Sequence, residues 1–194
     1  MPIDTTRRLD AVNLILSAIG VSPVASLSTE SDDTTTFAEL QLDATDREVQ
    51  TIGWWFNSYK RTYELVGTEV HLPSNILYVD GLHGAKYTLR DGRLFNLVDG
   101  SFDFTAAVKL KVVEMVDFAD LPEVARGFII GKASRRFADR QLGDPALSRF
   151  SRDDEQQAYM ALRKAHLRAG NFSIWGPSTK AALRRGGTLD HFTR

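Results

Sequence analysis

The sequence predicts an α+β fold: an antiparallel four-helix bundle with an inserted antiparallel β-meander and a C-terminal arm. Three observations predict it. Apolar residues recur at helical spacing at both ends of the chain. From residue 54 to about 116 the period changes to two, and three Asp-Gly pairs separate the short apolar segments. Helical and strand patterns occupy separate stretches, which is typical of the α+β class.

This pattern divides the chain into four expected parts. They are the first two bundle helices (1–53), the β-meander (54–117), the last two bundle helices (118–170) and a C-terminal arm (171–194).

Composition excludes several classes of protein. The chain has 194 residues, 43% of them hydrophobic and 25% charged, with a formal net charge of −1, as in an ordinary globular protein. A charge so close to zero gives no global attraction to nucleic acid or to a membrane. The absence of cysteine excludes disulfides, thiolate metal sites and a cysteine nucleophile. Asp10 and Asn13 interrupt the apolar segment after Arg7 and Arg8, so we expect a mature start rather than a signal peptide.

Two helices are expected before residue 53. The first has its apolar residues at helical spacing, a cap at Thr5 or Thr6 and a stop at Gly20. Residues 28–46 contain six acids and no base, which suits the N-terminus of a second helix, from about Thr34 to Ile52. Gly53 is its expected C′ residue. The apolar positions are Leu9, Val12, Leu16 and Ile19 in the first helix and, facing inward in the second, Phe37, Leu40, Ala44 and Ile52.

The meander is expected to begin at Trp54. Trp55, Tyr59, Tyr63 and Leu65 fall on one side of its first strand, and Val108, Leu110 and Val112 alternate with two lysines in its last. Asp-Gly favours a type I′ hairpin turn, in which both central residues have positive φ. Turns are therefore predicted at 80–81, 91–92 and 99–100.

Two further helices are expected after residue 118. Asp120 is a possible cap, Pro122 is tolerated in a first turn, and Gly143 and Pro145 end the third helix. A fourth helix is expected from Ser151 to Gly170. The third helix has Ile130, Ala133, Phe137 and Gln141 on one side and Lys132, Arg135, Arg136, Asp139 and Arg140 on another; the fourth has Ala158, Tyr159, Leu162 and Ala165 inward.

Three consecutive aromatic residues, Trp54, Trp55 and Phe56, cannot all lie on one face of a helix or strand. They are either an exposed binding platform or core residues at the transition from a helix to the sheet. Because large aromatics dominate core burial, we favour the core, with each ring buried in a different layer. Trp54 and Phe56 are then structural residues.

No catalytic or metal-binding motif is found. The four histidines, His71, His83, His166 and His191, are scattered, and no HExxH, GxSxG, P-loop or GxGxxG motif occurs. We therefore expect no metal site, no cofactor and no catalytic residue. Neighbouring carboxylates such as Asp153 and Asp154 could serve acid–base chemistry, but they are better explained as the acidic first turn of a helix.

The basic stripe of the third helix has two interpretations. It could bind phosphates or an acidic neighbouring surface, or it could be a solvated face partly paired with Asp139. The acidic 28–46 region offers a complementary surface in the same chain, which suits head-to-tail association of identical copies. The residues of this hypothetical subunit interface are Asp32, Asp33, Glu39, Asp43, Lys132, Arg135, Arg136 and Arg140.

Several phrases, in order, resemble the tail tubular protein A family, the head-to-tail adaptors of short-tailed phages (podoviruses). They are "AVNLILSAIGVSPV" (11–24), "REVQTIGWWFN" (47–57), "LP" (72–73), "DGRLFN" (91–96) and "GKASRRFADRQLG" (131–143), followed by Glu155 and Ala158.

This resemblance implies a structural virion protein of the tail, assembled in the host cytoplasm, and not an enzyme. Such adaptors form a ring, typically of twelve copies, between the portal protein and the tail nozzle (tail tubular protein B). They help to seat tail fibres and let DNA pass without sequence-specific binding, and no membrane is involved. The alternatives left open are a virion-associated glycan hydrolase with a carboxylate pair in the β part and a free nucleic-acid-binding protein.

The C-terminal segment 171–194 is basic and is broken by Gly-Pro and Gly-Gly pairs. It is either disordered or an arm that orders on a partner, with two aromatic anchors and several cations. By analogy with adaptor proteins, the expected partner is the portal. The residues of this hypothetical portal-docking arm are Phe172, Trp175, Lys180, Arg184 and Arg185.

Overall fold

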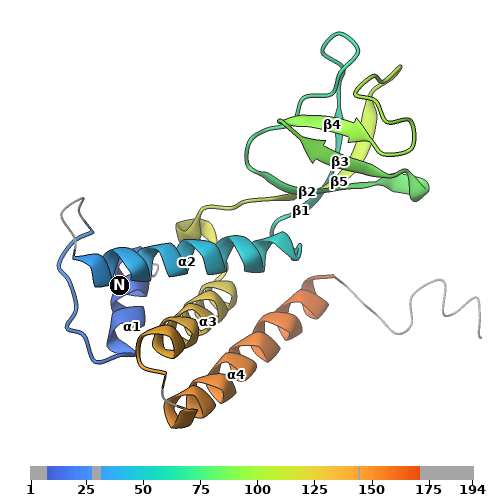
Figure 1. Ribbon diagram of the computed structural model, residues 1–194. Helices are drawn as coiled ribbons and strands as arrows, with labels where there is room; N and C mark the ends of the chain where they lie inside the picture. The colour runs from blue at the N-terminus through green and yellow to red at the C-terminus, as the bar shows by residue number, and fades with distance from the viewer. Residues whose placement is uncertain (1–7, 28–31, 144, 171–194) are drawn as a thin grey trace, which may run out of the picture.

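The computed structural model describes residues 8–27, 32–143 and 145–170 (Figure 1). The helices lie together in one part of the molecule and the strands in another (Figure 1). The helices are α1 (Arg8–Ser17), α2 (Asp33–Thr51), α3 (Glu123–Gln141) and α4 (Pro145–Ala169). The strands are β1 (Ser58–Tyr63), β2 (Ile76–Gly81), β3 (Tyr87–Arg90), β4 (Arg93–Asn96) and β5 (Val108–Glu114), with short 3-10 helices η1 (Leu82–Gly84) and η2 (Phe118–Asp120).

The ends of α2 follow from its sequence. The Asp32 carboxylate accepts a hydrogen bond of 2.7 Å from the backbone N–H of Thr35, which caps the helix and lowers the pKa of Asp32. Gly53 follows the helix with a φ of +83°, the left-handed conformation that favours glycine. A Cβ at this position would also lie 2.9 Å from Cγ2 of Val113 in β5. The predicted stop at Gly53 is confirmed.

The predicted four-helix bundle with an inserted meander is wrong, although the fold does mix helices with strands. Helix α3 lies between α2 and α4, so these three helices form a row (Figure 1). The much shorter α1 packs on α2 and α3. In a bundle the helices surround one core nearly in parallel. Here α4 packs chiefly against α3, and His166 near its end also contacts Trp54 and Trp55.

The inward face predicted for α2 is also wrong. Phe37, Leu40 and Ile52 are 57%, 58% and 62% exposed, and Ala44 is exposed as well. The buried face of α2 is largely polar, so the apolar residues did not mark it. It consists of Thr35, Ala38, Gln41, Leu42, Thr45, Asp46, Val49 and Gln50.

The last two helices begin at other residues than expected. Asp120 belongs to η2 instead of capping α3, which starts at Glu123 after Pro122. Helix α4 begins at Pro145, because proline is tolerated in a first helical turn. Leu162 is fully buried and Ala158 and Tyr159 are half-buried, as predicted.

The meander is replaced by two sheets. In the three-stranded sheet the order is β1-β5-β2, so the last strand in sequence pairs antiparallel with both of the first two. Strands β3 and β4 form a separate hairpin. Its turn at Asp91-Gly92 has φ values of 50° and 71°, as predicted for type I′.

The other two Asp-Gly pairs form no such hairpin. Gly81 ends β2 with a φ of −76°, so the predicted turn at 80–81 is wrong. In the turn at 99–100 only Gly100 has positive φ.

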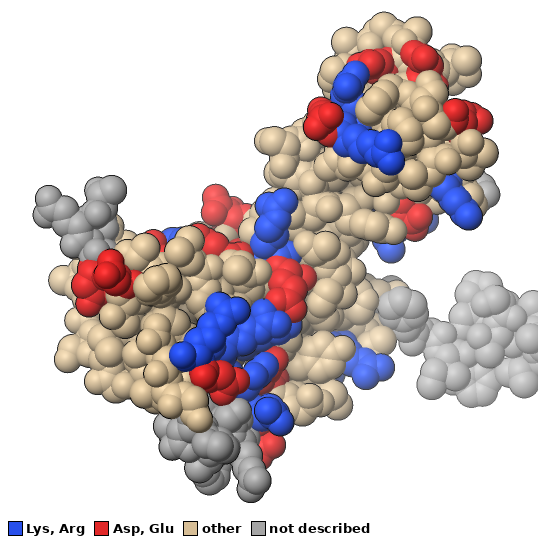
Figure 2. Space-filling view, viewed as in Figure 1, with Lys and Arg blue, Asp and Glu red and all other residues tan. Residues whose placement is uncertain are grey.

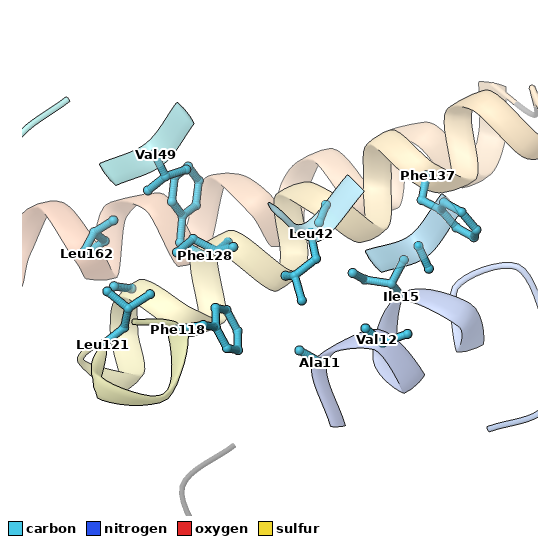
Figure 3. Close-up of a cluster of buried hydrophobic side chains, with 14 of the residues drawn as sticks. Ala11, Val12, Ile15, Leu42, Val49, Phe118, Leu121, Phe128, Phe137 and Leu162 are labelled. Atoms are coloured by element: carbon cyan, nitrogen blue, oxygen red, sulfur yellow. The ribbon is translucent and has the colours of Figure 1, made fainter. Parts of the chain in front are cut away.

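Two hydrophobic cores form, one in each part. The helical core includes Trp54, Phe118, Phe128, Phe137 and Leu162, and Figure 3 shows several of its side chains meeting between the helices. The β core is smaller and consists of Val70, Leu72, Ile76, Val79, Leu94, Leu110 and Val112.

The three aromatics at 54–56 belong to one core. Trp54 is only 5% exposed, which confirms its structural role, and Trp55 and Phe56 pack against the same helical core. The expectation that the rings bury in different layers is therefore wrong.

Candidate interaction surfaces

A polar junction joins the helical part to the β part. Val116 donates a backbone hydrogen bond of 2.8 Å to the Gln50 amide oxygen, and the Gln50 amide nitrogen donates one of 2.9 Å to the carbonyl of Val116. The Asn57 side chain donates to the carbonyls of Gln50 and Glu114 and accepts from the N–H of Trp54. Gln50 and Asn57 are fully buried. The junction therefore fixes how the two parts sit relative to each other.

Asp46 lies beside this junction in the buried face of α2. Burial raises its pKa from the ordinary value of 3.8 to about 6, because the charged form loses water. A hydrogen bond of 2.8 Å from Gln50 acts in the opposite direction. In the folded protein the carboxyl of Asp46 is therefore mostly protonated below about pH 6.

His166 links the end of α4 to the same region. Its Nδ1 accepts a hydrogen bond of 3.2 Å from the backbone N–H of Trp55, and its ring meets Trp54 edge-on at 5.5 Å between centroids. No sequence pattern predicts this role, because the histidine and the tryptophans lie far apart along the chain. Through this contact α4 is anchored at its C-terminal end to the junction.

The basic stripe of α3 makes its contacts within the chain. Glu48 of α2 accepts hydrogen bonds from Lys132 (2.9 Å) and Arg136, which lower its pKa to about 2, Arg136 having the larger effect. Arg135 pairs with Glu155 of α4 and with Asp139 (2.9 Å), and the pKa of Arg135 is raised chiefly by the hydrogen bond to Glu155. The predicted internal pairing with Asp139 is confirmed for Arg135.

Arg140 contacts the Gln41 amide oxygen at 2.6 Å. Figure 2 shows basic and acidic side chains gathered together over the middle of the helical part.

The acidic residues predicted for the interface are placed on or before α2. Asp32 caps the helix, and Asp33 is exposed in its first turn. Arg8 of α1 pairs with Asp43, at 2.8 Å for one nitrogen–oxygen contact, and lies 3.7 Å from Glu39. The structure therefore does not bring these acids to the basic stripe of the same copy. The arm residues Phe172, Trp175, Lys180, Arg184 and Arg185 lie outside the described residues.

A groove runs between α2 and α3. Its volume is about 470 Å³, and apolar atoms of Phe37, Leu40, Ala44 and Phe137 line it together with Arg136 and Arg140. Phe37 and Leu40 are more than half exposed at its edge. Exposed large apolar side chains gathered at one place are typical of protein–protein contact surfaces.

The outer side of α4 is a second exposed surface. Met160 and Leu167 are 52% and 48% exposed, and Arg163 and Lys164 lie between them at helical spacing. We call these four residues the α4 flank. The sequence analysis missed it, although the apolar pair seven residues apart, on the face opposite Leu162, was a readable signal.

The glycan hydrolase alternative requires a carboxylate pair in a hollow of the β part. Asp99 and Asp103 line a hollow of about 500 Å³. Both are exposed and hold turns: Asp99 accepts from the Asn96 amide at 2.5 Å, and Asp103 accepts from Thr68 at 2.7 Å. Asp153 and Asp154 are also exposed, on the helical part. This arrangement explains the β-part acids as turn-stabilising groups.

The described residues contain neither a metal-binding cluster nor a membrane-spanning helix. Within 8–27, 32–143 and 145–170, no cluster of three or more His, Cys, Asp or Glu residues could hold a metal ion. Over the same ranges, no helix has the length and apolar character needed to cross a membrane.

Comparison with known proteins gives a consistent result. A family model described as tail tubular protein matches residues 9–172. Tail tubular protein A of Klebsiella phage KP34 is 35% identical over 184 residues, which covers 92% of this chain and 97% of that relative.

Proposed function

Because this chain belongs to the tail tubular protein family, a family of structural phage tail proteins, we propose that it is the adaptor that joins portal to tail nozzle. In this proposal identical copies form a ring in the virion tail, and DNA leaves the head through its channel. The observation that carries the proposal is the family match across 9–172, together with a relative aligned over almost its full length. The protein acts by assembly rather than by catalysis.

The partners follow from this role. The ring, of about twelve copies as is typical of such adaptors, contacts the portal protein on one side and the nozzle on the other. Tail fibres are a further possible partner. DNA passes through the channel without sequence-specific contacts, and the chain assembles in the host cytoplasm before it becomes part of the virion tail.

Subunit contacts in the ring are proposed along α2. Its acids and the exposed apolar side chains of Phe37 and Leu40 support this choice. The basic stripe of α3 is a weaker candidate for the other half of the contact. Lys132, Arg135 and Arg136 already make ion pairs within their own copy, and an intermolecular contact would first have to break them.

The C-terminal segment 171–194 is proposed as the arm that docks on the portal, with the aromatic anchors and cations named above. Deletion of 171–194 should leave a stable chain that no longer attaches to portal-bearing heads. Normal attachment of the truncated chain would refute the arm, and loss of folding would show that the segment packs on its own helices.

Imaging of assembled virions by cryo-electron microscopy tests the main proposal. We expect this chain as a closed ring between the portal and the nozzle. Density for the chain at another place in the virion, or absence of the chain from tails that are otherwise complete, would refute it.

A further inference from the structure

The α4 flank is open because α4 has its packing partners on the opposite side. Leu162 is fully buried, and Tyr159 lies over Phe128 of α3 at 5.5 Å between ring centroids. Met160 and Leu167 point the other way and are about half exposed. A methionine and a leucine two helical turns apart on one exposed face form a surface that a second helix can cover.

Helix α2 lies at the other end of the row α2–α3–α4 (Figure 1). There Phe37, Leu40 and Ala44 recur at helical spacing and are exposed. Exposure of a phenylalanine and a leucine is unfavourable in water, since burial of such side chains stabilises a contact. Each copy therefore presents two exposed apolar helix surfaces, one on α2 along the groove beside α3 and one on the α4 flank.

The two surfaces carry opposite charge. The exposed acids of α2 are Asp33, Asp43 and Glu48, against the exposed base Arg47. Asp43 and Glu48 also pair with bases of their own copy, and the buried Asp46 takes no part. The segment 160–169 of α4 has three bases and no acid (Arg163, Lys164 and Arg168). All three bases are exposed, and none of them makes an ion pair with any residue of the described part of the chain.

The opposite charge of the two surfaces favours a contact between different surfaces of two copies over a symmetric contact. Two copies that met symmetrically through α2 would place acids against acids, and two that met through α4 would place bases against bases. Contact between α2 of one copy and α4 of another pairs unlike charges and covers both apolar stripes. A contact between two different surfaces is heterologous, and repeated copies then close into a ring if the rotation allows it.

We propose that α4 of one copy lies along α2 of the next, so that Met160 and Leu167 cover Phe37, Leu40 and Ala44. This inference rests on the proposed ring. It differs from the charge hypothesis of the sequence analysis, because the basic partner of α2 is the α4 flank and not the α3 stripe.

The chain contains no cysteine, so introduced thiols report this contact without background. The double variant Leu40→Cys/Met160→Cys is assembled into rings and treated with a thiol-specific crosslinker that spans the roughly 8–10 Å between packed helix axes. We expect a ladder of species beyond the dimer on a denaturing gel. Either single variant alone should give no ladder, and a mixture of the two should stop at the dimer.

The matched control is Val98→Cys/Met160→Cys, which moves one thiol to an exposed residue of the β part. Rings that form but give no ladder, or an equal ladder from the control, would overturn the inference and leave the proposed function intact. Failure of the wild-type chain to form rings even with portal-bearing heads would overturn the proposed function, and the inference with it.

A charge variant gives an independent measurement. Arg163→Glu/Lys164→Glu changes two exposed residues that make no ion pair with the described chain, so its melting temperature should stay unchanged. We expect loss of rings and of the ladder in this variant. Normal rings with an unchanged ladder would count against the proposed contact.

Discussion

The helical part and the β part are stabilised in different ways. The helical core is the larger, and it holds most of the large aromatics, including Trp54, Phe118, Phe128 and Phe137. The β core contains only aliphatic residues among its fully packed members, and ring contacts lie around its edge. There Arg90 and Arg93 stack on Phe95 and Phe102, at 3.8 and 4.2 Å from the ring centroids.

Their surfaces differ as well. On the helices, large apolar side chains stay exposed on α2 and α4 beside ion pairs that link neighbouring helices. On the β part, short turns tie polar side chains to the backbone, as Asn96 does for the turn 97–100. The difference teaches that the helical part leaves apolar side chains exposed beside its ion pairs, whereas the β part is a small core fixed to it by directional hydrogen bonds.

The largest effect on stability is expected when Trp54, a buried aromatic residue of the helical core, is removed. Trp54→Ala removes a buried ring and its hydrogen bond of 2.7 Å to the carbonyl of Val49. We expect a loss of about 3–5 kcal/mol in the free energy of unfolding, a large share of the ~5–15 kcal/mol of a typical domain. Urea unfolding followed by circular dichroism measures it. The exposed Leu40→Ala is the control, and an equal loss in both variants would contradict the packing described here.

The next largest effect is expected at the junction, where a substitution should destabilise the β part more than the helical part. Gln50→Leu leaves the N–H and carbonyl of Val116 without their side-chain partner, and a buried unsatisfied group costs about 1–3 kcal/mol. We expect a total loss of about 2–3 kcal/mol and faster amide hydrogen exchange in β1 and β5 than in α3. The same change at the exposed Gln157 should have almost no effect. Uniform exchange in both parts of Gln50→Leu would refute the junction as the coupling element.

A smaller effect, dependent on pH, is expected at Asp46. Its pKa is about 6 in the folded protein and 3.8 ordinarily, so the folded state holds the proton more tightly. Stability from this group is therefore complete below about pH 4 and falls as pH rises through 6. Asp46→Asn should remove that fall and be more stable than wild type by about 1–2 kcal/mol at pH 7.5. Thermal melts across pH 4–8 check it, and parallel curves for the two proteins would contradict it.

The smallest effect concerns the exposed ion pairs of the helices. The pKa of Glu48 is about 2, below its ordinary 4.5, so its contribution is complete above pH 4.5 and is lost as pH falls toward 2. Because Glu48 is half exposed, solvent screens the pairs, and Glu48→Gln should cost only about 0.5–1 kcal/mol at pH 7. The cost should shrink in high salt. A loss as large as that of Trp54→Ala would show that ion pairs, and not the core, dominate the helical part.

Local signals in the sequence predicted the helices and, for α2, both ends well. The acids before α2 and the glycine after it indicated its span, because capping depends on neighbouring residues only. The turn at Asp91-Gly92 was predicted for the same reason. The division of the chain at residues 53, 117 and 170 stays a prediction.

Long-range features were not predictable in the same way. Strand β5 pairs with both β1 and β2, and nothing within the strand says which partner it takes. The buried face of α2 carries Gln41, Asp46 and Gln50, whose polarity is satisfied by partners such as Arg140 and Val116. Hydrophobic periodicity therefore pointed to Phe37 and Leu40, which lie at the surface. The predicted subunit interface stays a prediction, and the sequence did not reveal the partners that its charged residues have within the chain.

The reciprocal pair of hydrogen bonds between Gln50 and Val116 has a mechanical consequence. The chain passes between the two parts at 53–57 and again at 115–117. Gln50 reaches the second crossing directly, and Asn57, in the first, bonds to Gln50 and to Glu114. A pull on the sheet is therefore shared by both crossings at once instead of opening them in turn. Torque applied to the β part is therefore transmitted to the C-terminal end of α2. The sheet and the row of helices then rotate together.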